Sequence, residues 1–328
     1  MRKIRFATIG TSAIVNEFLQ EAKTCESFLY VGAYSRDKKR ARELAKPFGA
    51  VKFYDSIERL SKDSDIDAVY IASPNSLHYE QTIAMLQGQK HVLCEKPFAA
   101  NKAQAQEMLT LAKQNPLVCM EAMRSLYDPA FTVIKNNLHK LGPIRMSSFL
   151  FCQFSSRYTS YKNGNWENRF SPEMAGGALM DLGIYCVEPM IYLFGEPLKM
   201  HTDSVILNGK IDGAGSVIAR YDSHLVNLHY SKISKGVVPS TIQGEKGTML
   251  IEAIDTPKRI EIVYQDGEKE LLLGSQEESN MSYEIKGFLQ AISGKYDIES
   301  RQEVTLLAMK LIDTIKKEEK RDGGNKIP

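Results

Sequence analysis

The first candidate site follows the first apolar run of the chain, Ile4 to Ile9, which predicts a strand. The residues after it are Gly10-Thr11-Ser12-Ala13-Ile14-Val15. A Gly-x-Gly-x-x-Gly/Ala fingerprint belongs in this place, where a strand turns into a helix and backbone amides bind a dinucleotide pyrophosphate. Only the first glycine is present, because Ser12 and Val15 take the second and third positions. The motif alone leaves two interpretations open, a dinucleotide site and a tight turn that binds no cofactor.

The end of the second predicted strand, Leu29 to Tyr34, bears on which dinucleotide would bind. In NAD-binding domains an Asp or Glu about 20 residues beyond the fingerprint accepts a hydrogen bond from the ribose 2′-hydroxyl. Ser35 takes that place here, and Arg36 follows it. A guanidinium can bind a 2′-phosphate through two parallel hydrogen bonds and Ser35 could add a third, so the pair favours NADP. The alternative makes Asp37 the ribose acceptor, or Arg36 a solvated surface residue.

Two further segments hold acid–base side chains. Glu95-Lys96-Pro97 follows a predicted strand, and Asp181 and Tyr185 lie four residues apart, on one face of a predicted helix. Oxidising a secondary alcohol needs a hydride acceptor and a base, and a nearby ammonium can lower the pKa of a tyrosine, about 10 when free, toward neutrality. Asp181 could orient Lys96 or bind a substrate hydroxyl. The structural alternatives are a core Tyr185 and a surface Lys96 before a helix-starting proline.

The elements that position these residues differ between the two halves of the chain. Up to about residue 122, short apolar runs alternate with helix-like stretches, which indicates crossover units and a parallel sheet that binds ligands at the carboxyl ends of its strands. The expected strands are 4–9, 29–34, 67–72, 91–94 and 117–121, and the expected helices are 16–23, 38–48, 77–86 and 102–112. We therefore predict a doubly wound dinucleotide-binding domain over residues 1–122.

Residues 123–328 are expected to form an α+β domain that binds substrate and mediates oligomerisation. A helix over 178–194 precedes β-like runs between Lys199 and Leu273, and turn pairs such as Asn208-Gly209 and Asp266-Gly267 suit tight hairpins. This pattern predicts a large, mainly antiparallel open sheet. Two helices, over 283–293 and 302–317, close the chain.

The motifs occur in an order that resembles the Gfo/Idh/MocA oxidoreductases, and the resemblance covers nearly the whole chain. The supporting segments are Ser73-Pro74-Asn75-Ser76-Leu77-His78, Cys94-Glu95-Lys96-Pro97, Gly176-Gly177-Ala178-Leu179-Met180-Asp181-Leu182-Gly183-Ile184-Tyr185 and Gly244-Glu245-Lys246-Gly247. Many family members carry Asp-x-x-x-His where this chain has Asp181 and Tyr185. The tyrosine form is similar to the subgroup that includes glucose–fructose oxidoreductase, dimeric dihydrodiol dehydrogenase and NADP-dependent xylose dehydrogenase.

The resemblance implies an NAD(P)-dependent dehydrogenase, with NADP preferred and NAD possible, that passes a hydride between nicotinamide C4 and a sugar, polyol or vicinal diol. Tyr185 would be the acid/base, assisted by Lys96, with Asp181 beside them. The implied cofactor-binding residues are Gly10, Thr11, Ser12, Ala13, Ile14, Ser35, Arg36, Ser73, Pro74, Asn75, His78, Glu95 and Lys96. The implied substrate-binding residues are Arg124, Arg157, Tyr158, Tyr161 and Trp166, most of them in a polar, aromatic loop whose alternative is a structured surface loop.

Composition excludes several other classes. A formal charge of +2 gives no general attraction for nucleic acid or an anionic membrane, and apolar runs such as Ala68 to Ala72 are far shorter than the about 20 residues of a membrane span. Five scattered cysteines predict a reducing, cytoplasmic environment, and the histidines show no metal-ligand spacing. The resemblance implies a homodimer or homotetramer packed through the open sheet. Two alternatives stay open, a non-catalytic nucleotide-sensing regulator and an enzyme for anionic or nucleotide-linked sugars.

Overall fold

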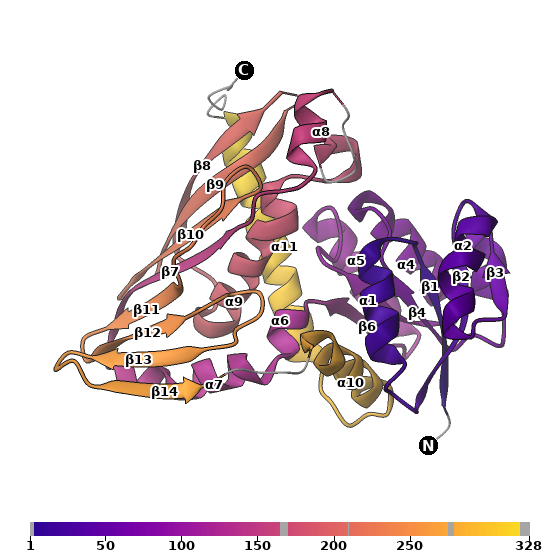
Figure 1. Cartoon of the computed structure of the whole chain (residues 1–328), viewed down its shortest axis with the longest axis horizontal. Coiled ribbons are helices and arrows are strands. Elements are labelled where there is room, and N and C mark those ends of the chain that lie inside the picture. The colour runs from indigo at the N-terminus through magenta and orange to yellow at the C-terminus, as the bar shows by residue number, and fades with distance from the viewer. Residues whose placement is uncertain (1–2, 165–169, 209, 275–278, 322–328) are drawn as a thin grey trace. The chain divides into compact units, whose positions relative to one another are not determined.

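The computed structural model describes residues 3–164, 170–208, 210–274 and 279–321, and for 319–321 the backbone alone. The chain divides into two compact units, which are described separately (Figure 1). The first unit contains Met1–Met123 and Met281–Leu306, and the second contains Arg124–Asn280 and Leu307–Pro328. The sequence analysis expects residues 123–328 to form the second domain. Residues 281–306 instead pack with the N-terminal residues in the first unit.

The first unit is built on a parallel six-stranded sheet, which confirms the predicted Rossmann architecture. The strands are β1 (Ile4–Ile9), β2 (Phe28–Tyr34), β3 (Lys52–Tyr54), β4 (Ala68–Ile71), β5 (His91–Glu95) and β6 (Cys119–Ala122), in the order β3-β2-β1-β4-β5-β6. The connecting helices are α1 (Ala13–Ala22), α2 (Lys38–Ala45), α3 (Ile57–Lys62), α4 (His78–Gln87) and α5 (Lys102–Gln114). The order reverses between β1 and β4, and such a switch point is where open α/β sheets bind ligands.

Aromatic side chains fill the core on one side of this sheet. Phe18 of α1 stacks on Tyr70 of β4 with ring centroids 3.7 Å apart, and Phe6 of β1 stacks on Phe28 of β2 at 3.8 Å. Phe28 also meets Phe288 edge-on at 6.2 Å. Because strands of a parallel sheet are covered on both faces, their residues are apolar in nearly continuous runs rather than alternating.

Phe288 lies on α10 (Asn280–Ile292), and the start of α11 (Glu299–Arg321) is attached to the same unit. The amide of Gln302 donates to the carbonyl of Cys119 at 3.0 Å, and the Thr305 hydroxyl donates to the Glu121 carboxylate at 2.7 Å. These long-range bonds to β6 explain why residues 281–306 join the N-terminal unit. The local sequence of these helices does not predict these bonds.

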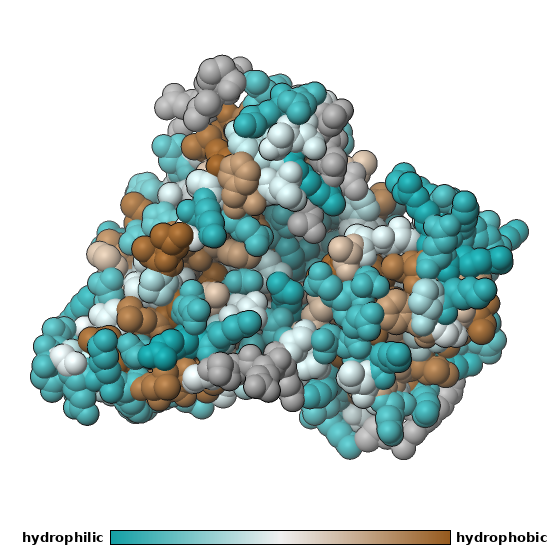
Figure 2. Space-filling view, in the orientation of Figure 1, coloured by the Kyte–Doolittle hydropathy of each residue, from teal (hydrophilic) through white to brown (hydrophobic). Residues whose placement is uncertain are grey.

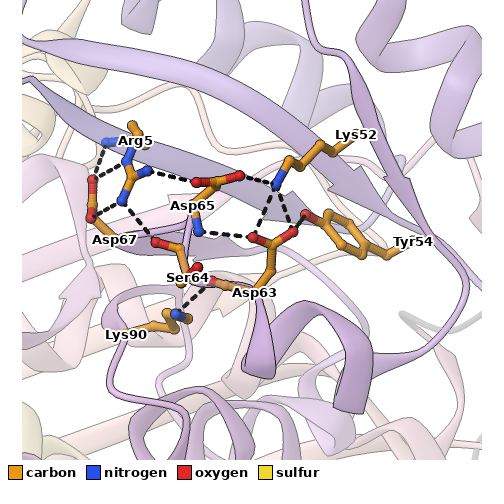
Figure 3. A network of polar contacts seen from close by, with 8 residues as sticks. All are labelled: Arg5, Lys52, Tyr54, Asp63, Ser64, Asp65, Asp67 and Lys90. Carbon is orange, nitrogen blue, oxygen red and sulfur yellow. Dashed lines mark hydrogen bonds and ion pairs between the residues drawn. The ribbon is translucent and has the colours of Figure 1, made fainter.

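A polar network fastens the amino ends of the strands (Figure 3). The guanidinium of Arg5, in β1, donates two hydrogen bonds of 2.9 and 2.8 Å to the carboxylate of Asp67, which precedes β4. Lys52, the first residue of β3, donates to Asp63 at 2.8 Å and to Asp65 at 2.6 Å. The network lies at the edge of the sheet opposite to the carboxyl ends, so it stabilises the fold away from the candidate site.

The second unit is built on an eight-stranded sheet in the order β14-β13-β12-β11-β7-β10-β9-β8. Its strands are β7 (Ile144–Cys152), β8 (Lys199–Leu207), β9 (Ile211–Arg220), β10 (Leu225–Ser231), β11 (Ser240–Gly244), β12 (Gly247–Ile251), β13 (Ile260–Tyr264) and β14 (Lys269–Leu273). Only the β7–β10 pair is parallel among these, which confirms the predicted mainly antiparallel sheet. The short helices of the unit are α6 (Arg124–Tyr127), α7 (Pro129–Asn137) and α8 (Tyr158–Lys162).

The expected helix over 178–194 is a π-helical turn, Leu179–Gly183, followed by α9 (Ile184–Phe194). The stretch Pro172–Phe194 is long and apolar enough to cross a membrane by length and composition, but 78% of the tested window is buried inside the fold. In Figure 1, α9 and α11 run along one face of the sheet. The stretch therefore has the burial of a core helix.

The opposite face of this sheet carries exposed apolar residues. In β10, the buried Val226, Leu228 and Tyr230 alternate with residues that point the other way. On that other side Leu225 pairs with Met146 of β7, and these residues are 38% and 40% exposed. Ile218 of β9 adds to the same face. Figure 2 shows that apolar residues are otherwise interspersed with hydrophilic ones on the visible surface.

Candidate active site

The loop after β1 has the backbone that a dinucleotide site requires. Gly10 adopts a φ of +119°, and a Cβ at this position would lie 2.5 Å from the carbonyl oxygen of Ala72. Its amide donates to the Tyr34 carbonyl at 3.2 Å, which joins the carboxyl ends of β1 and β2. Only glycine fits both the conformation and the space. The residues present therefore fit the pyrophosphate of a bound nicotinamide dinucleotide.

The two departures from the glycine fingerprint have different surroundings. Ser12 is the exposed N-cap residue of α1, and its hydroxyl makes no capping hydrogen bond to the helix. Val15 is fully buried, so a valine is accommodated where a small residue usually lets helix and strand pack closely. Ala13 and Ile14 begin α1, and Thr11 lies in the loop before it. The N-terminus of α1 therefore remains open to an anion.

The structure shows what Asp37 and its neighbours contact after β2. The Asp37 carboxylate is the N-cap of α2, where it accepts from the Lys39 amide at 2.9 Å and lies 3.8 Å from Arg40. Ser35 is half-buried and accepts a hydrogen bond from the Asp37 amide at 3.3 Å, while the side chain of Arg36 is exposed. Asp37 thus has a structural task, which weakens its assignment as the ribose acceptor.

The Glu-Lys-Pro segment is held by hydrogen bonds from two neighbouring strands. The Tyr70 hydroxyl donates to the Glu95 carboxylate at 2.6 Å, and the Phe98 amide donates to Glu121 at 2.8 Å. A cis peptide bond joins Lys96 to Pro97, and Lys96 is half-buried. The backbone on both sides of Lys96 is therefore fixed by neighbouring strands.

His78 links this segment to the loop after β4. One ring nitrogen lies 2.9 Å from the Pro97 carbonyl and the other lies 3.0 Å from the Ser73 carbonyl. The ring is fully buried, and burial lowers its pKa. Pro74 and Asn75 lie at the start of the short 3₁₀ turn between Ser73 and His78. His78 therefore supports the cofactor loops through their backbone, while the expected residues of β1, β2, β4 and β5 gather at one edge of the sheet.

In the second unit, Asp181 lies in the π-helical turn and Tyr185 in the first turn of α9. The Tyr185 side chain is mostly buried, and its ring meets Phe151 edge-on at 5.3 Å. Single π-turns within helices are frequent at functional sites. The helix thus displays Asp181 and Tyr185 about one turn apart, as the spacing predicts.

Lys232, which follows β10, lies beside Asp181 although no sequence motif points to it. Its ammonium lies 3.1 Å from the Asp181 carboxylate and 4.5 Å from the centre of the Phe170 ring. The Lys232 side chain is 2% exposed and that of Asp181 is 13% exposed. From sequence alone, a lysine at the end of a strand looks like a solvated surface residue. Asp181 and Lys232 lie far apart in the chain, and no local pattern links them.

No sequence motif points to Asp212 of β9 either. Its carboxylate accepts from the Leu179 amide at 2.6 Å and so caps the π-helical turn. Burial raises the pKa of Asp212, and the Leu179 bond and nearby lysines oppose that rise. A Cβ on Gly177, whose φ is +111°, would lie 1.9 Å from an Asp212 oxygen. Gly177 is therefore required at the entrance to this helix.

The predicted substrate residues are only partly grouped. Tyr161 is buried, its hydroxyl donates to the Asn208 carbonyl, and it packs with Phe170 and Tyr158. Arg157, at the start of α8, is exposed. Arg124 lies 3.8 Å from Asp255 in an ion pair. Trp166 lies outside the described residues. Tyr161 thus supports the loop, and Tyr158 and Arg157 are the more accessible members of this group.

Two further points concern metal binding and cavities. Within the described ranges, no group of three or more His, Cys, Asp or Glu side chains could hold a metal ion. A cavity of about 320 Å³ is lined by Arg5, Asp67 and Lys90 among others, at the amino edge of the first sheet. Its position is opposite to the carboxyl ends where the cofactor residues gather.

Comparison with known proteins decides the family. Residues 4–123 match the oxidoreductase family with an NAD-binding Rossmann fold, and residues 139–250 match the GFO/IDH/MocA C-terminal domain. The chain belongs to the Gfo/Idh/MocA oxidoreductase family. This result confirms the resemblance on which the sequence interpretation rested. The chain is therefore an enzyme, an NAD(P)-dependent oxidoreductase.

Its relatives include dehydrogenases and a reductase. The scyllo-inositol 2-dehydrogenase (NADP(+)) IolU of Bacillus subtilis is 40% identical over 318 residues, which cover 96% of this chain and 97% of the relative. The trans-1,2-dihydrobenzene-1,2-diol dehydrogenase of Mus musculus is 29% identical over 265 residues, which cover 78% and 77%. The crystal structure of KijD10, a 3-ketoreductase from Actinomadura kijaniata in complex with NADP and TDP-benzene, has a TM-score of 0.86 at 24% identity over 99% of both chains. This last likeness shows a shared fold.

Proposed function

We propose that this enzyme is an NADP-dependent dehydrogenase that oxidises a CH–OH group of a neutral polyol, sugar or vicinal diol. The observation that carries the proposal is the 40% identity to an NADP-dependent inositol dehydrogenase over nearly the full length of both chains. The mouse diol dehydrogenase supports the same class of substrate, in which a hydroxyl group is oxidised beside another hydroxyl.

In the proposed mechanism Tyr185 removes the hydroxyl proton of the substrate, or returns it in the reverse direction. Lys96 stabilises the phenolate and so lowers the pKa of the tyrosine toward neutral pH, where it can act as a base. Bound NADP supplies the hydride acceptor at nicotinamide C4. Asp181, four residues before Tyr185, accepts a hydrogen bond from a substrate hydroxyl.

The proposed preference for NADP depends on Ser35 and Arg36. An exposed guanidinium at the end of β2 can take the 2′-phosphate of NADP through a bidentate contact. The use of Asp37 as a helix cap supports this assignment, because that carboxylate is engaged by the Lys39 amide. A carboxylate free to bind the 2′-hydroxyl would instead favour NAD.

We also propose a cytoplasmic homodimer or homotetramer whose subunits pack through the open face of the second sheet. Met146, Ile218 and Leu225 lie on that face with more than a third of each residue exposed, and a partner subunit would cover them. All five cysteines are free thiols, in keeping with a reducing compartment.

Reduction of NADP by the purified enzyme tests the proposed function. The panel holds scyllo-inositol, other inositols, aldoses and vicinal diols, with NAD in parallel and a set of sugar phosphates and nucleotide-linked sugars. Turnover of a neutral polyol with NADP at higher kcat/KM than with NAD is the expected result. Turnover of anionic or nucleotide-linked sugars alone would contradict the proposed substrate class, and tight NADPH binding without turnover of any compound would favour a regulator.

A further inference from the structure

We propose that Lys232 is a positioning residue, which holds the Asp181 carboxylate where it accepts a hydrogen bond from a hydroxyl of a neutral substrate. The inference rests on the proposed function and deepens it, because it assigns a residue outside the known motifs to substrate selection. It begins from the ion pair of 3.1 Å between the Lys232 ammonium and the Asp181 carboxylate.

The burial of the two partners decides which of them can meet a substrate. The Lys232 side chain is 2% exposed, whereas that of Asp181 is 13% exposed. Asp181 is therefore the more accessible partner, and a ligand would meet it before the buried ammonium. Lys232 must act through Asp181, and what the substrate meets is a hydrogen-bond acceptor with negative charge, which favours hydroxyl groups and disfavours phosphates.

Lys232 is itself firmly placed. Its backbone amide donates to the Gly213 carbonyl at 2.8 Å, and its carbonyl accepts from the Ser155 amide at 2.9 Å. Its ammonium lies 4.5 Å from the centre of the Phe170 ring, and Phe170 is fully buried. The backbone of Lys232 is thus held by β9 and by the segment before α8, and its ammonium packs against Phe170.

The electrostatics make Asp181 dependent on this cation. A charge that is removed from water is costly unless it is paired, so the two groups stabilise each other in the fold. Asp212, whose carboxylate caps the same helical turn, brings a second acidic group near Lys232. Lys316 of α11 is the other cation close to Asp212. Without Lys232, Asp181 would lose its partner on this side and turn toward water or take up a proton.

The test compares Lys232→Met, Asp181→Asn and the double variant with the wild type, using scyllo-inositol and NADP. Methionine keeps much of the alkyl stem and removes the charge. Because Asp181 binds a hydroxyl that does not react, we expect KM to rise about 10- to 100-fold, as for the loss of a hydrogen bond to a charged group, and kcat to change much less. In the Asp181→Asn background, Lys232→Met should add less than a further threefold effect, in line with coupled residues.

Lys135→Met is the matched control. Lys135 belongs to the same unit, and its ammonium lies 4.5 Å from the centre of the Tyr192 ring, but it is exposed. We expect this variant to keep the KM and kcat of the wild type. NADPH affinity and the thermal midpoint, measured for every variant, report folding. Should Lys232→Met not fold, Lys232→Arg replaces it, and its displaced charge should also raise KM.

Three outcomes are distinguishable. A raised KM in Lys232→Met that disappears in the Asp181→Asn background supports the inference. An unchanged KM, or a fall in kcat alone that matches a loss of folded enzyme, overturns it. A wild type that reduces NADP with none of the neutral polyols in the panel overturns the proposed function first, and the inference with it.

Discussion

The substitution Gly177→Ala tests how the helix that carries Asp181 and Tyr185 is built. Gly177 has a φ of +111°, and an added Cβ would lie 1.9 Å from the Asp212 carboxylate that accepts from the Leu179 amide at 2.6 Å. Two costs follow. The positive φ costs an L-residue about 1–3 kcal/mol, and losing the charged hydrogen bond costs about 1.5–3 kcal/mol.

Gly195 separates these two costs. It ends α9 in the same unit with a φ of +77°, and among the described residues, its chain neighbours aside, no atom lies within 4 Å of an added Cβ. Gly195→Ala therefore carries the backbone cost alone. Since 1 kcal/mol shifts the unfolding midpoint by about 2–4 °C in a domain of this size, Gly177→Ala should unfold about 3–12 °C below Gly195→Ala.

Thermal unfolding by calorimetry measures the difference, and kcat/KM on the best polyol reports the site. We expect Gly177→Ala to lose activity and Gly195→Ala to keep it. Combining Gly177→Ala with Asp212→Ala removes the clash, so the added cost of the alanine at 177 should fall to that of Gly195→Ala. Equal midpoints for the two single variants would refute the reasoning, because Asp212 would then not occupy the space beside Gly177.

Tyr185→Phe removes the hydroxyl proposed to transfer the proton and should lower kcat about 100- to 10,000-fold, with the NADPH dissociation constant unchanged in a fluorescence titration. Arg36→Ala should weaken NADPH binding about tenfold or more and leave NADH binding unchanged. Ile218→Asp puts a charge on the open sheet face and should convert the proposed oligomer to a monomer in sedimentation. Burial raises the pKa of Asp63, but hydrogen bonds, led by one from Lys52, outweigh it and lower that pKa to about 2. The stabilisation is therefore complete above about pH 4 and lost as the pH falls toward 2, so urea unfolding should show Asp63→Asn less stable than wild type at pH 7 and equal to it near pH 2.

For each of these predictions, a specific result would contradict it. Near-normal turnover in Tyr185→Phe would remove the tyrosine from catalysis. Equal losses of NADPH and NADH affinity in Arg36→Ala would mean that this side chain does not select the 2′-phosphate. A wild type that sediments as a monomer at micromolar concentration would end the oligomer proposal, and an Asp63→Asn variant whose stability deficit is independent of pH would contradict the assigned ion pair.

Much of the fold follows from local sequence patterns. Alternating apolar runs and helical stretches predict the parallel sheet, and turn pairs at regular spacing predict the antiparallel one. The strand Lys52–Tyr54 and the short helix after it escape the local pattern because they are only three and six residues long. Residues 281–306 belong to the first unit through distant partners such as Cys119 and Glu121, which no local pattern reveals.

In the candidate site too, local motifs identify some residues, whereas contacts between distant parts of the chain are not predictable from them. Gly10 and the spacing of Asp181 and Tyr185 are local features, and the structure gives each a physical role. Lys232 meets Asp181 only through sheet pairing, so its sequence context gives no sign of burial. The hydroxyl of Tyr161 donates to the Asn208 carbonyl, a distant contact that the sequence of a polar loop does not predict.

The measurement that tests the central claim most directly is isotope transfer. The enzyme is incubated with NADP and scyllo-inositol deuterated at its carbinol carbons, and the reduced cofactor is analysed by NMR and mass spectrometry. The account predicts one deuterium at nicotinamide C4 and a ketone product in equal amount. Reduced cofactor without deuterium would contradict direct hydride transfer from the CH–OH group, and failure of every neutral polyol or diol to give reduced cofactor would contradict the proposed function.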